Sequence, residues 1–457
     1  MAFLPSLLLL LAQSSAVELT SFPEDMQLYP RNAQGLAAVH ATGAVTEAGW
    51  NQAVLYVERD GAPFAMRQQS LTYIGGRADF DLKVNIHAEL HAYDFSLYLR
   101  NNAQRRKAAE AENVVAGDAF LIQGQSNAVA WDSYGQGFAN QHQSNWIRSF
   151  GTKSLDALEA VTNVTWYMAD GESTVDAGAI GQWGIRMGHQ LVTNTGIPVA
   201  ILNGAVGATP IAFHVRHDSN PYDPTTNYGR LLTRARNAGL QDSVRAILWH
   251  QGEANGARHV HYAWTFKKIY LDWLEDYSAV EKVYVFQVRN GCGNPSVELR
   301  NVQRRLKEFL SKVEVMSTSA VRAHDGCHYF WGGYRQMGDQ ISLQVGRDLY
   351  GWTDTYEIDP PYLLKARFTN PQQNSIVLIF ADPDDRLIFE PGAEQDFELE
   401  DGVQVLSADV LGNKVRLNLS GPTTSVTIAY QGHSYDGAWL KNGRGVGALT
   451  FKVIIRD

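Results

Sequence analysis

The middle of the chain alternates short, continuous apolar runs with longer stretches of helical periodicity. The apolar runs fall at 120–123, 199–202, 246–249, 283–288 and 313–316, and the helical patterns fall at 184–193, 228–238, 262–277, 296–310 and 334–350. A strand that is apolar on both faces must be covered on both faces, and helices between such strands supply that cover. The alternation therefore predicts an α/β fold with a parallel sheet between two layers of helices.

The regions before and after this core carry the patterns of β-strands. Apolar and polar residues alternate over 80–86 and 93–99, and strand patterns at 375–380, 414–419, 425–430 and 449–455 follow a linker at 359–361 (Asp-Pro-Pro). A chain of 457 residues is also too long for one typical core. We expect a signal peptide at 1–16, a β-sandwich-like domain at 17–115, an α/β domain at 116–355 and a second β-sandwich-like domain at 362–457.

Three polar motifs follow the ends of predicted strands. They are Gly-Gln-Ser-Asn at 124–127, Trp-His-Gln-Gly-Glu at 249–253 and Asp-Gly-Cys-His at 325–328. Open parallel sheets bind ligands beyond the carboxyl ends of their strands, so the motifs are expected at one edge. A serine hydroxyl needs an adjacent base to act as a nucleophile. We interpret Ser126 as the nucleophile, His328 as the base that takes its proton, and Asp325 as the acid that orients the imidazole.

In this order the motifs resemble those of the SGNH hydrolases, in the branch of the sialate O-acetylesterases and acetylxylan esterases. The resemblance covers 117–350. It implies a flavodoxin-like sheet, an acyl-serine intermediate and no cofactor. It also implies that the acyl group is acetyl and that the alcohol is a carbohydrate. The identity of the sugar stays open among acetylated sialic acid, acetylxylan and acetylated algal or pectic polymers.

The resemblance further assigns the groups around the nucleophile. It implies three donors to the oxyanion: the backbone N–H groups of Ser126 and Gly207 and the side-chain amide of Gln251. Loss of one such donor typically costs ~10²–10³ in turnover. Supporting roles fall to Asn127 and Glu253. The chain departs from the family at Ala208, where relatives often carry a second glycine.

Each of these residues also has a plainer interpretation. Taken alone, Ser126 is typical of a residue that caps a helix. Asp325 is typical of a loop cap and His328 of a surface histidine. Gln251 is typical of a strand-end residue that hydrogen-bonds to local backbone. Glu253 paired with Asp325 would suggest a glycosidase, although the supporting role is favoured. The alternative function is a non-catalytic carbohydrate-binding protein on the same fold. The intact set of motif residues argues against that alternative.

Other residues near the motifs are of types that bind metals or sugars. His250, His259 and His261 cluster in the sequence, but no carboxylate lies at ligand spacing, and no metal is assigned. Four side chains are candidates for stacking on a sugar ring: Trp131, Tyr134, Trp183 and His214. Packing in the core is the plainer interpretation of these four.

The first residues are typical of a secretory signal. An apolar stretch at 3–11 precedes the small residues Ser14, Ser15 and Ala16, and it is too short to span a bilayer. We therefore expect export to an extracellular, periplasmic or lysosomal space, without a membrane anchor. Cys292 follows one predicted strand and Cys327 lies between Asp325 and His328, so a disulfide is expected if both reach the same sheet edge.

The charge of the chain limits its partners. Its formal net charge is −9, which argues against nucleic acid or an anionic membrane as partner. The most compact basic run, Arg105-Arg106-Lys107, is short and is followed by Glu110 and Glu112. The expected partner is an acetylated carbohydrate substrate.

Overall fold

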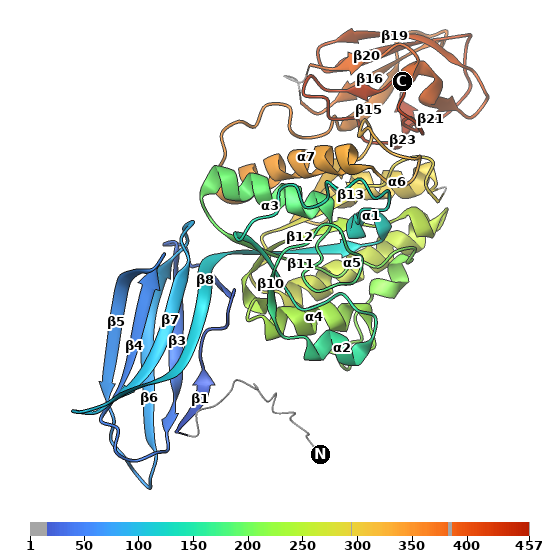
Figure 1. Ribbon diagram of the computed structural model, residues 1–457. Coiled ribbons are helices and arrows are strands. Elements are labelled where there is room, and N and C mark those ends of the chain that lie inside the picture. The colour runs from blue at the N-terminus through green and yellow to red at the C-terminus, as the bar shows by residue number, and fades with distance from the viewer. Residues whose placement is uncertain (1–15, 294, 383–385, 457) are drawn as a thin grey trace. The chain divides into compact units, whose positions relative to one another are not determined.

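The computed structural model describes residues 16–293, 295–382 and 386–456 (Figure 1). Except for Ala16, the predicted signal peptide at 1–16 lies outside the described residues. The chain divides into two compact units, Met1–Asp118 with Gly196–Pro198, and Ala119–Thr195 with Val199–Asp457. In the described part, no helix is both long enough and apolar enough to cross a membrane.

The first unit is built from β-strands in two groups. An antiparallel sheet joins β1 (Val17–Ser21), β3 (Leu36–Val45) and β6 (Ala78–His87). The other group pairs β5 (Ala62–Ser70), β4 (Gln52–Arg59), β7 (Tyr93–Arg100) and the start of β8 (Arg105–Gly124), along which β2 (Leu28–Pro30) runs parallel. Alternate residues of both groups, such as Val39, Phe80, Leu55 and Phe95, bury one shared cluster. The alternation predicted at 80–86 and 93–99 lies in β6 and β7.

The second unit contains the predicted parallel sheet. Its strands, in spatial order, are β10 (Trp166–Met168), β9 (Ile147–Phe150), β11 (Val199–Asn203), the end of β8, β12 (Val244–His250), β13 (Lys282–Gln287) and β14 (Val313–Ser317). The five predicted apolar runs fall on β8, β11, β12, β13 and β14. Counted in chain order, these five lie as 2-1-3-4-5, the order of flavodoxin-like sheets. The apolar runs did not predict β9 and β10, which extend the sheet beyond β11.

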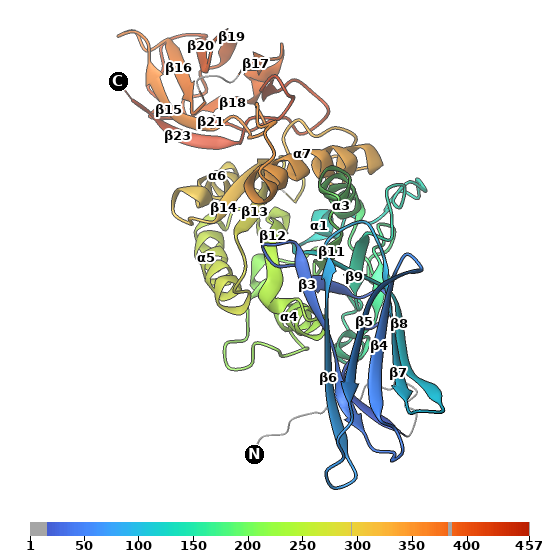
Figure 2. The ribbon, with the colours of Figure 1, turned by 90° about the vertical axis from the view of Figure 1, so that its left-hand side faces the viewer.

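Helices cover both faces of this sheet (Figures 1 and 2). One face carries α3 (Gln182–Thr195) and α7 (Trp331–Tyr350), and the other carries α4 (Asn227–Asn237) and α5 (His259–Asp276). The shorter helical elements are α1 (Ser126–Val129), α2 (Ala157–Thr162), α6 (Val297–Arg305), η1 (Ile211–His214), η2 (Gln241–Ser243), η3 (Glu253–Asn255) and η4 (Leu306–Glu308).

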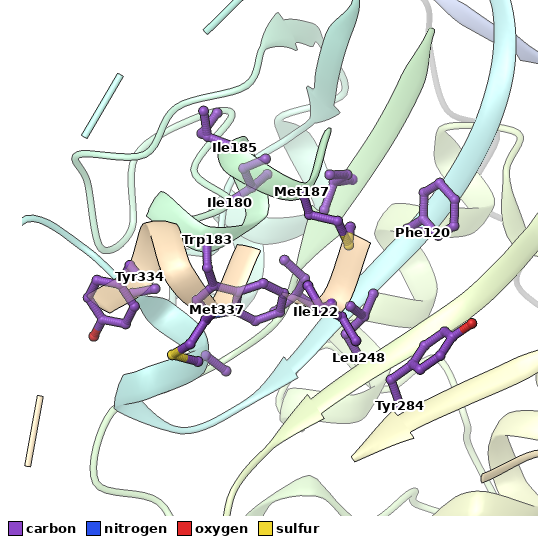
Figure 3. Packing of buried hydrophobic residues seen from close by; sticks show 14 of the residues in the cluster. Phe120, Ile122, Ile180, Trp183, Ile185, Met187, Leu248, Tyr284, Tyr334 and Met337 are labelled. Atoms are coloured by element: carbon purple, nitrogen blue, oxygen red, sulfur yellow. The ribbon is translucent and has the colours of Figure 1, made fainter. Parts of the chain in front are cut away.

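Neighbouring residues of a strand serve opposite faces of the sheet. Ile122 and Leu248 pack with Trp183 of α3 in one buried cluster (Figure 3). Trp249, the next residue after Leu248, makes ring contacts with Trp273 of α5 on the other side. Burial on both faces is why these strands are apolar without alternation.

The last part of the chain forms a second β-structure. One sheet has the order β18 (Phe397–Leu399), β21 (Thr427–Tyr430), β23 (Phe451–Arg456), β15 (Leu363–Phe368), β16 (Ser375–Phe380), β20 (Lys414–Leu419) and β19 (Val405–Leu411). A short pair joins β17 (Ile388–Phe389) and β22 (Leu440–Lys441), and η5 (Ala393–Asp396) precedes β18. The sandwich-like form of both β-regions and the boundaries at 115, 355 and 362 stay predictions.

Candidate active site

The functional motifs lie where parallel strands end. Strands β8, β9, β11, β12, β13 and β14 run parallel, so their carboxyl ends share one edge of the sheet. The residues that follow these ends are Ser126 after β8, Gly207 after β11, Glu253 after β12, Cys292 after β13 and His328 after β14. This is the edge at which open parallel sheets bind their ligands.

A tight turn between β8 and α1 presents Ser126. Gly124 has φ of 140°, a conformation that favours glycine, and a Cβ there would overlap the carbonyl group of His250 on β12. The next residue, Gln125, donates its backbone N–H to that same carbonyl oxygen at 2.9 Å. The glycine thus lets β8 end close against β12 and places Ser126 as the first residue of α1.

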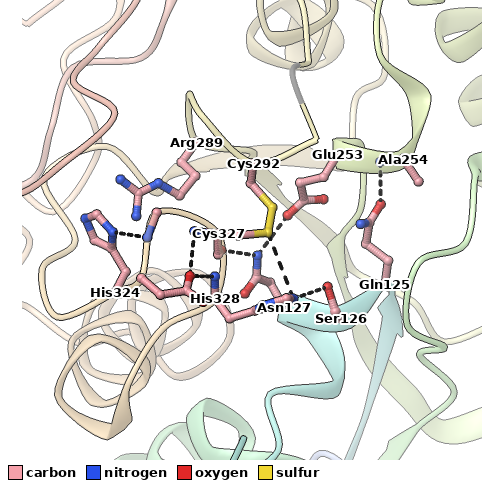
Figure 4. The surroundings of a disulfide bond; sticks show 12 residues. Gln125, Ser126, Asn127, Glu253, Ala254, Arg289, Cys292, His324, Cys327 and His328 are labelled. Carbon is pink, nitrogen blue, oxygen red and sulfur yellow. Dashed lines mark hydrogen bonds between the residues drawn. A yellow bond between two sulfur atoms is a disulfide. The ribbon is translucent and has the colours of Figure 1, made fainter. Parts of the chain in front are cut away.

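The serine and the histidine meet across 202 residues of sequence. His328 Nε2 lies 2.9 Å from Ser126 Oγ (Figure 4). Both side chains are partly buried. A hydroxyl at hydrogen-bond distance from an imidazole nitrogen is the geometry in which the imidazole can take the hydroxyl proton.

Asp325 holds the turn that carries His328. Its Oδ1 accepts the backbone N–H groups of Cys327 and His328, both at 2.7 Å, and its Oδ2 accepts the hydroxyl of Tyr134. Burial raises the pKa of Asp325, but these hydrogen bonds outweigh burial and bring the pKa below its usual value. Among the described residues, no hydrogen bond joins the carboxylate to the imidazole ring. The structure therefore departs from the expected contact: the carboxylate binds the backbone of its own turn and the Tyr134 hydroxyl, and not the imidazole ring.

Two of the three predicted oxyanion donors are unpaired. Neither the backbone N–H of Ser126 nor that of Gly207 donates a hydrogen bond within the described chain. A Cβ placed on Gly207 would lie 4.0 Å from the Cβ of Ser126, so the two residues are neighbours. A pair of free N–H groups beside a nucleophile is what an oxyanion hole requires.

The third predicted donor, Gln251, is engaged elsewhere. Its Nε2 lies 2.6 Å from Asn255 Oδ1 and 3.1 Å from both Gln125 Oε1 and the Thr209 carbonyl oxygen. The side chain is fully buried. An amide with two hydrogens and three acceptors has none left for an oxyanion. The structure thus corrects the role of Gln251 to one of tying the loops after β8, β11 and β12 together.

Ala208 adopts a backbone conformation that favours glycine. Its φ is 58°, in the left-handed region that disfavours residues with a Cβ. The hydroxyl of the next residue, Thr209, donates to the carbonyl of Val206 at 2.7 Å and closes the turn. The turn after β11 thus holds an alanine in a conformation that a glycine adopts more readily.

A buried polar network supports the loops from behind. Asn127 Nδ2 donates to Glu253 Oε1 at 3.0 Å and to the carbonyl oxygen of Cys327 at 3.1 Å. His250 Nε2 lies 3.3 Å from Glu253 Oε1. Burial raises the pKa of Glu253, but contacts with His250 and Asn127 outweigh burial and lower it overall. Glu253 therefore acts on the catalytic loop through Asn127, and no contact pairs it with Asp325 in the described structure.

A disulfide joins two of the loops. Cys292, after β13, is bonded to Cys327, which immediately precedes His328 (Figure 4). The sulfur of Cys327 lies 4.0 Å from His328 Nε2. The bond fixes one end of the peptide that carries the base.

A pocket opens beside the serine. Its volume is about 240 Å³, and Ser126 and Gly207 line it together with Trp131, Val129, Leu155, Val175, Ala205, Val206, Thr174 and Lys153. Sequence reasoning did not single out Lys153. The residue follows β9, so recognition of that strand would have placed Lys153 at the ligand edge.

The remaining candidates separate by exposure. Trp131 is 40% exposed and Tyr134 is 38% exposed, whereas Trp183 and His214 are fully buried and are unavailable for stacking on a sugar. His250 is buried. His259 and His261 lie in the first turn of α5, whereas the helical pattern at 262–277 had placed both residues before the helix. Within the described ranges, no three His, Cys, Asp or Glu side chains gather where they could hold a metal ion.

Comparison with known families decides the class of this site. Residues 116–345 match the family described as carbohydrate esterase, sialic acid-specific acetylesterase. The chain belongs to this family. The matched segment is half of the chain and includes all the predicted site residues, so the motifs at 124–127, 249–253 and 325–328 are those of a carbohydrate esterase family.

Solved structures are similar over different shares of the chain. A carbohydrate acetylesterase from Xanthomonas citri has a TM-score of 0.66 and 19% sequence identity, and the match covers 96% of this chain and 99% of that chain. At this identity, the likeness shows the fold alone. A protein from Arabidopsis thaliana has a TM-score of 0.38 and 16% identity, over 50% of this chain and 98% of that chain. No curated protein sequence matches this carbohydrate esterase chain.

Proposed function

We propose that this esterase removes acetyl groups from a glycan through an acyl-serine intermediate. The observation that carries the proposal is the 2.9 Å contact between Ser126 Oγ and His328 Nε2, because Ser126 also lines a pocket. The family of the chain and the two free N–H groups beside Ser126 support the same chemistry.

The reaction runs in two halves. His328 Nε2 takes the proton from Ser126 Oγ as the oxygen attacks the acetyl carbonyl carbon. The N–H groups of Ser126 and Gly207 receive the negative charge that develops on the carbonyl oxygen. The imidazolium then returns the proton to the sugar oxygen, which leaves as an alcohol. A water molecule repeats the sequence on the acyl-serine and releases acetate.

Asp325 serves this cycle through charge and position. Its ionised carboxylate holds the backbone of the turn that carries His328. The negative charge also stabilises the imidazolium that forms during each half-reaction. This role needs no hydrogen bond to the ring itself.

The carbohydrate part of the proposal rests on exposed aromatic rings near the site. Trp131 lines the pocket with Ser126, and Tyr134 donates to the catalytic-loop carboxylate of Asp325. Rings that are partly exposed at a pocket can pack against the apolar face of a sugar. Two further aromatic rings lie 5.5 Å apart between centroids. Phe138, in the loop that also holds Trp131 and Tyr134, is exposed, and Trp331, at the start of α7, is partly exposed.

We also propose that the enzyme is exported. The apolar residues 3–11 and the small residues at 14–16 support a secretory signal. The disulfide between Cys292 and Cys327 supports an oxidising destination, since such bonds persist mainly outside the cytosol.

Acetate release from a panel of acetylated glycans tests the proposal. We expect release by the wild-type protein from at least one glycan and release near background by Ser126→Ala. Retained folding of the variant is checked by its thermal unfolding. Equal activity of both proteins would remove Ser126 as the nucleophile, and silence of both on every ester would favour a binding protein on the same fold.

A further inference from the structure

Lys153 has an unusual environment for a cation. It lies in the loop after β9 and is 6% exposed. Its Nζ is buried and has no hydrogen-bond partner in the described structure. A buried ammonium without a partner is costly, because its hydration is lost and not replaced. Such a group lowers the stability of the fold, so its retention suggests a role in binding a ligand.

The surroundings leave Lys153 without a counter-ion of its own. Arg234 is a second buried cation nearby, and its guanidinium donates to the carbonyl oxygens of Phe150 and Asn203. Asp170, the acid whose charge acts on Lys153, already accepts from Asn140 Nδ2 at 2.7 Å. Burial and the charge of Arg234 lower the pKa of Lys153 to about 7, against a smaller opposing effect of Asp170. An anion that enters from outside would meet this excess of positive charge.

The position of Lys153 links this charge to the reaction. Lys153 and Ser126 line the same pocket of about 240 Å³, and most of the other lining residues are apolar. The pocket is larger than an acetyl group needs, so part of the sugar also fits. An apolar wall strengthens the attraction between a cation and an anion, because few waters screen it. The ammonium has no hydrogen bond to give up when its side chain turns towards a ligand.

We propose that the pocket beside Ser126 is a subsite for an anionic substituent of the acetylated sugar, and that Lys153 supplies the counter-charge. A carboxylate and a sulfate ester share this chemistry. The inference rests on the proposed function, because it names the class of sugar that the esterase site takes.

The test compares three acetylated methyl glycosides that carry the acetyl group at the same hydroxyl. They are the neutral glucoside, the glucuronoside with its carboxylate, and a sulfated glucoside. For the wild-type protein, we expect kcat/KM to favour one anionic ester over the neutral ester by roughly 10-fold or more, as for other hydrogen bonds to charged groups. The anion with the larger preference identifies the substituent.

Variants assign that preference to Lys153. Lys153→Met keeps the length of the side chain without its charge, and we expect the ratio of anionic to neutral kcat/KM to fall to near unity. Lys153→Arg keeps the charge and should keep most of the ratio. Lys267→Met is the matched control, since Lys267 is exposed on α5. A ratio near unity in the wild-type protein, or an unchanged ratio in Lys153→Met, would overturn the inference.

A binding measurement covers the case in which Lys153→Met folds poorly. Titration of Ser126→Ala with methyl glucuronoside and with methyl glucoside should show tighter binding of the anion. Equal binding of the two would contradict the inference. The proposed function fails separately: it fails if the wild-type protein releases acetate from none of the three esters, whereas the inference fails if all are cleaved without preference for an anion.

Discussion

At the scale of single residues, Asp325 can assist His328 in two ways: by its charge and its hold on the loop, or by fixing the tautomer of the imidazole. Its oxygens accept two backbone N–H groups and the Tyr134 hydroxyl, and none from the imidazole. Asp325→Asn keeps one carbonyl oxygen for the backbone and removes the charge. We expect its kcat to fall by much less than the ~10⁴-fold that follows loss of an acid that holds the histidine tautomer. Steady-state kinetics of Asp325→Asn beside His328→Asn would show this, and equal losses would favour the tautomer role.

Ala208 carries strain that a glycine would relieve. At φ of 58°, an alanine costs about 1–2 kcal/mol relative to the ordinary helical region. Ala208→Gly should therefore raise the midpoint of thermal unfolding, after a partial offset from the greater freedom of glycine in the unfolded chain. Ala235→Gly, inside α4, is the control and should lower the midpoint. A lower midpoint for Ala208→Gly would mean that the alanine methyl group contributes packing that exceeds the strain.

Lys153 makes stability depend on pH in a defined direction. Burial and, to a smaller extent, the charge of Arg234 lower its pKa from the usual 10.5 to about 7 in the folded protein, and Asp170 opposes this shift. Between these values the unfolded chain binds more protons, so this group makes folding more favourable as pH rises through that window. Below it, the full cost of the buried charge remains.

Lys153→Met should therefore raise the midpoint of thermal unfolding most at low pH. The gain over the wild-type protein is expected to be larger at about pH 6 than at about pH 9, because the wild-type lysine is mostly neutral at the higher pH. Thermal unfolding at the two pH values measures the difference, and Lys267→Met gives the baseline. A gain that is constant with pH would show that Lys153 keeps an ordinary pKa.

The sequence identified some site residues and misjudged others for physical reasons. Ser126 and His328 were predictable because strand ends in a parallel sheet converge, and the contact between them follows. Gln251 was misjudged because its amide binds three acceptors from segments far apart in the chain. Lys153 was missed because a lysine in a polar loop looks exposed, and only the folded chain buries it.

At the scale of elements, the disulfide couples β13 to the catalytic loop. It closes a loop of 35 residues, for which chain entropy predicts a stabilisation of about 3–4 kcal/mol. Reduction should lower both the unfolding midpoint and kcat, because Cys327 precedes His328. The double variant Cys292→Ser/Cys327→Ser should resemble the reduced protein and show no response to reductant. An unchanged midpoint and activity on reduction, with the free thiols verified, would contradict this coupling.

Element prediction succeeded where one physical signal dominated. Strands β8, β11, β12, β13 and β14 are buried on both faces, which produces apolar runs. Strand β9 is also fully buried, but it contains Arg148 and Ser149, so it forms no such run. Arg148 is tolerated there because its Nε donates to the carbonyl of Asn145. A local pattern cannot reveal a buried arginine whose partner is supplied by the fold.

At the scale of the whole molecule, the α/β core and the last β-region form one unit. Arg300 on α6 is 1% exposed and donates to Gln431 and Thr450 of the β-region. The formal net charge of −9 opposes the approach of an anionic sugar at long range. Any preference for an anion must therefore arise locally, in the pocket that Lys153 and Ser126 share.

If Ser126 is the nucleophile, it must carry the acetyl group as an ester during turnover. Mixing the enzyme with p-nitrophenyl acetate, quenching with acid and mapping the peptides by mass spectrometry would locate that acetyl group. We expect an acetyl group on Ser126 of the wild-type protein and no adduct in Ser126→Ala. An acetyl group on another residue during turnover, or release of acetate by Ser126→Ala at the wild-type rate, would show that Ser126 is not the nucleophile.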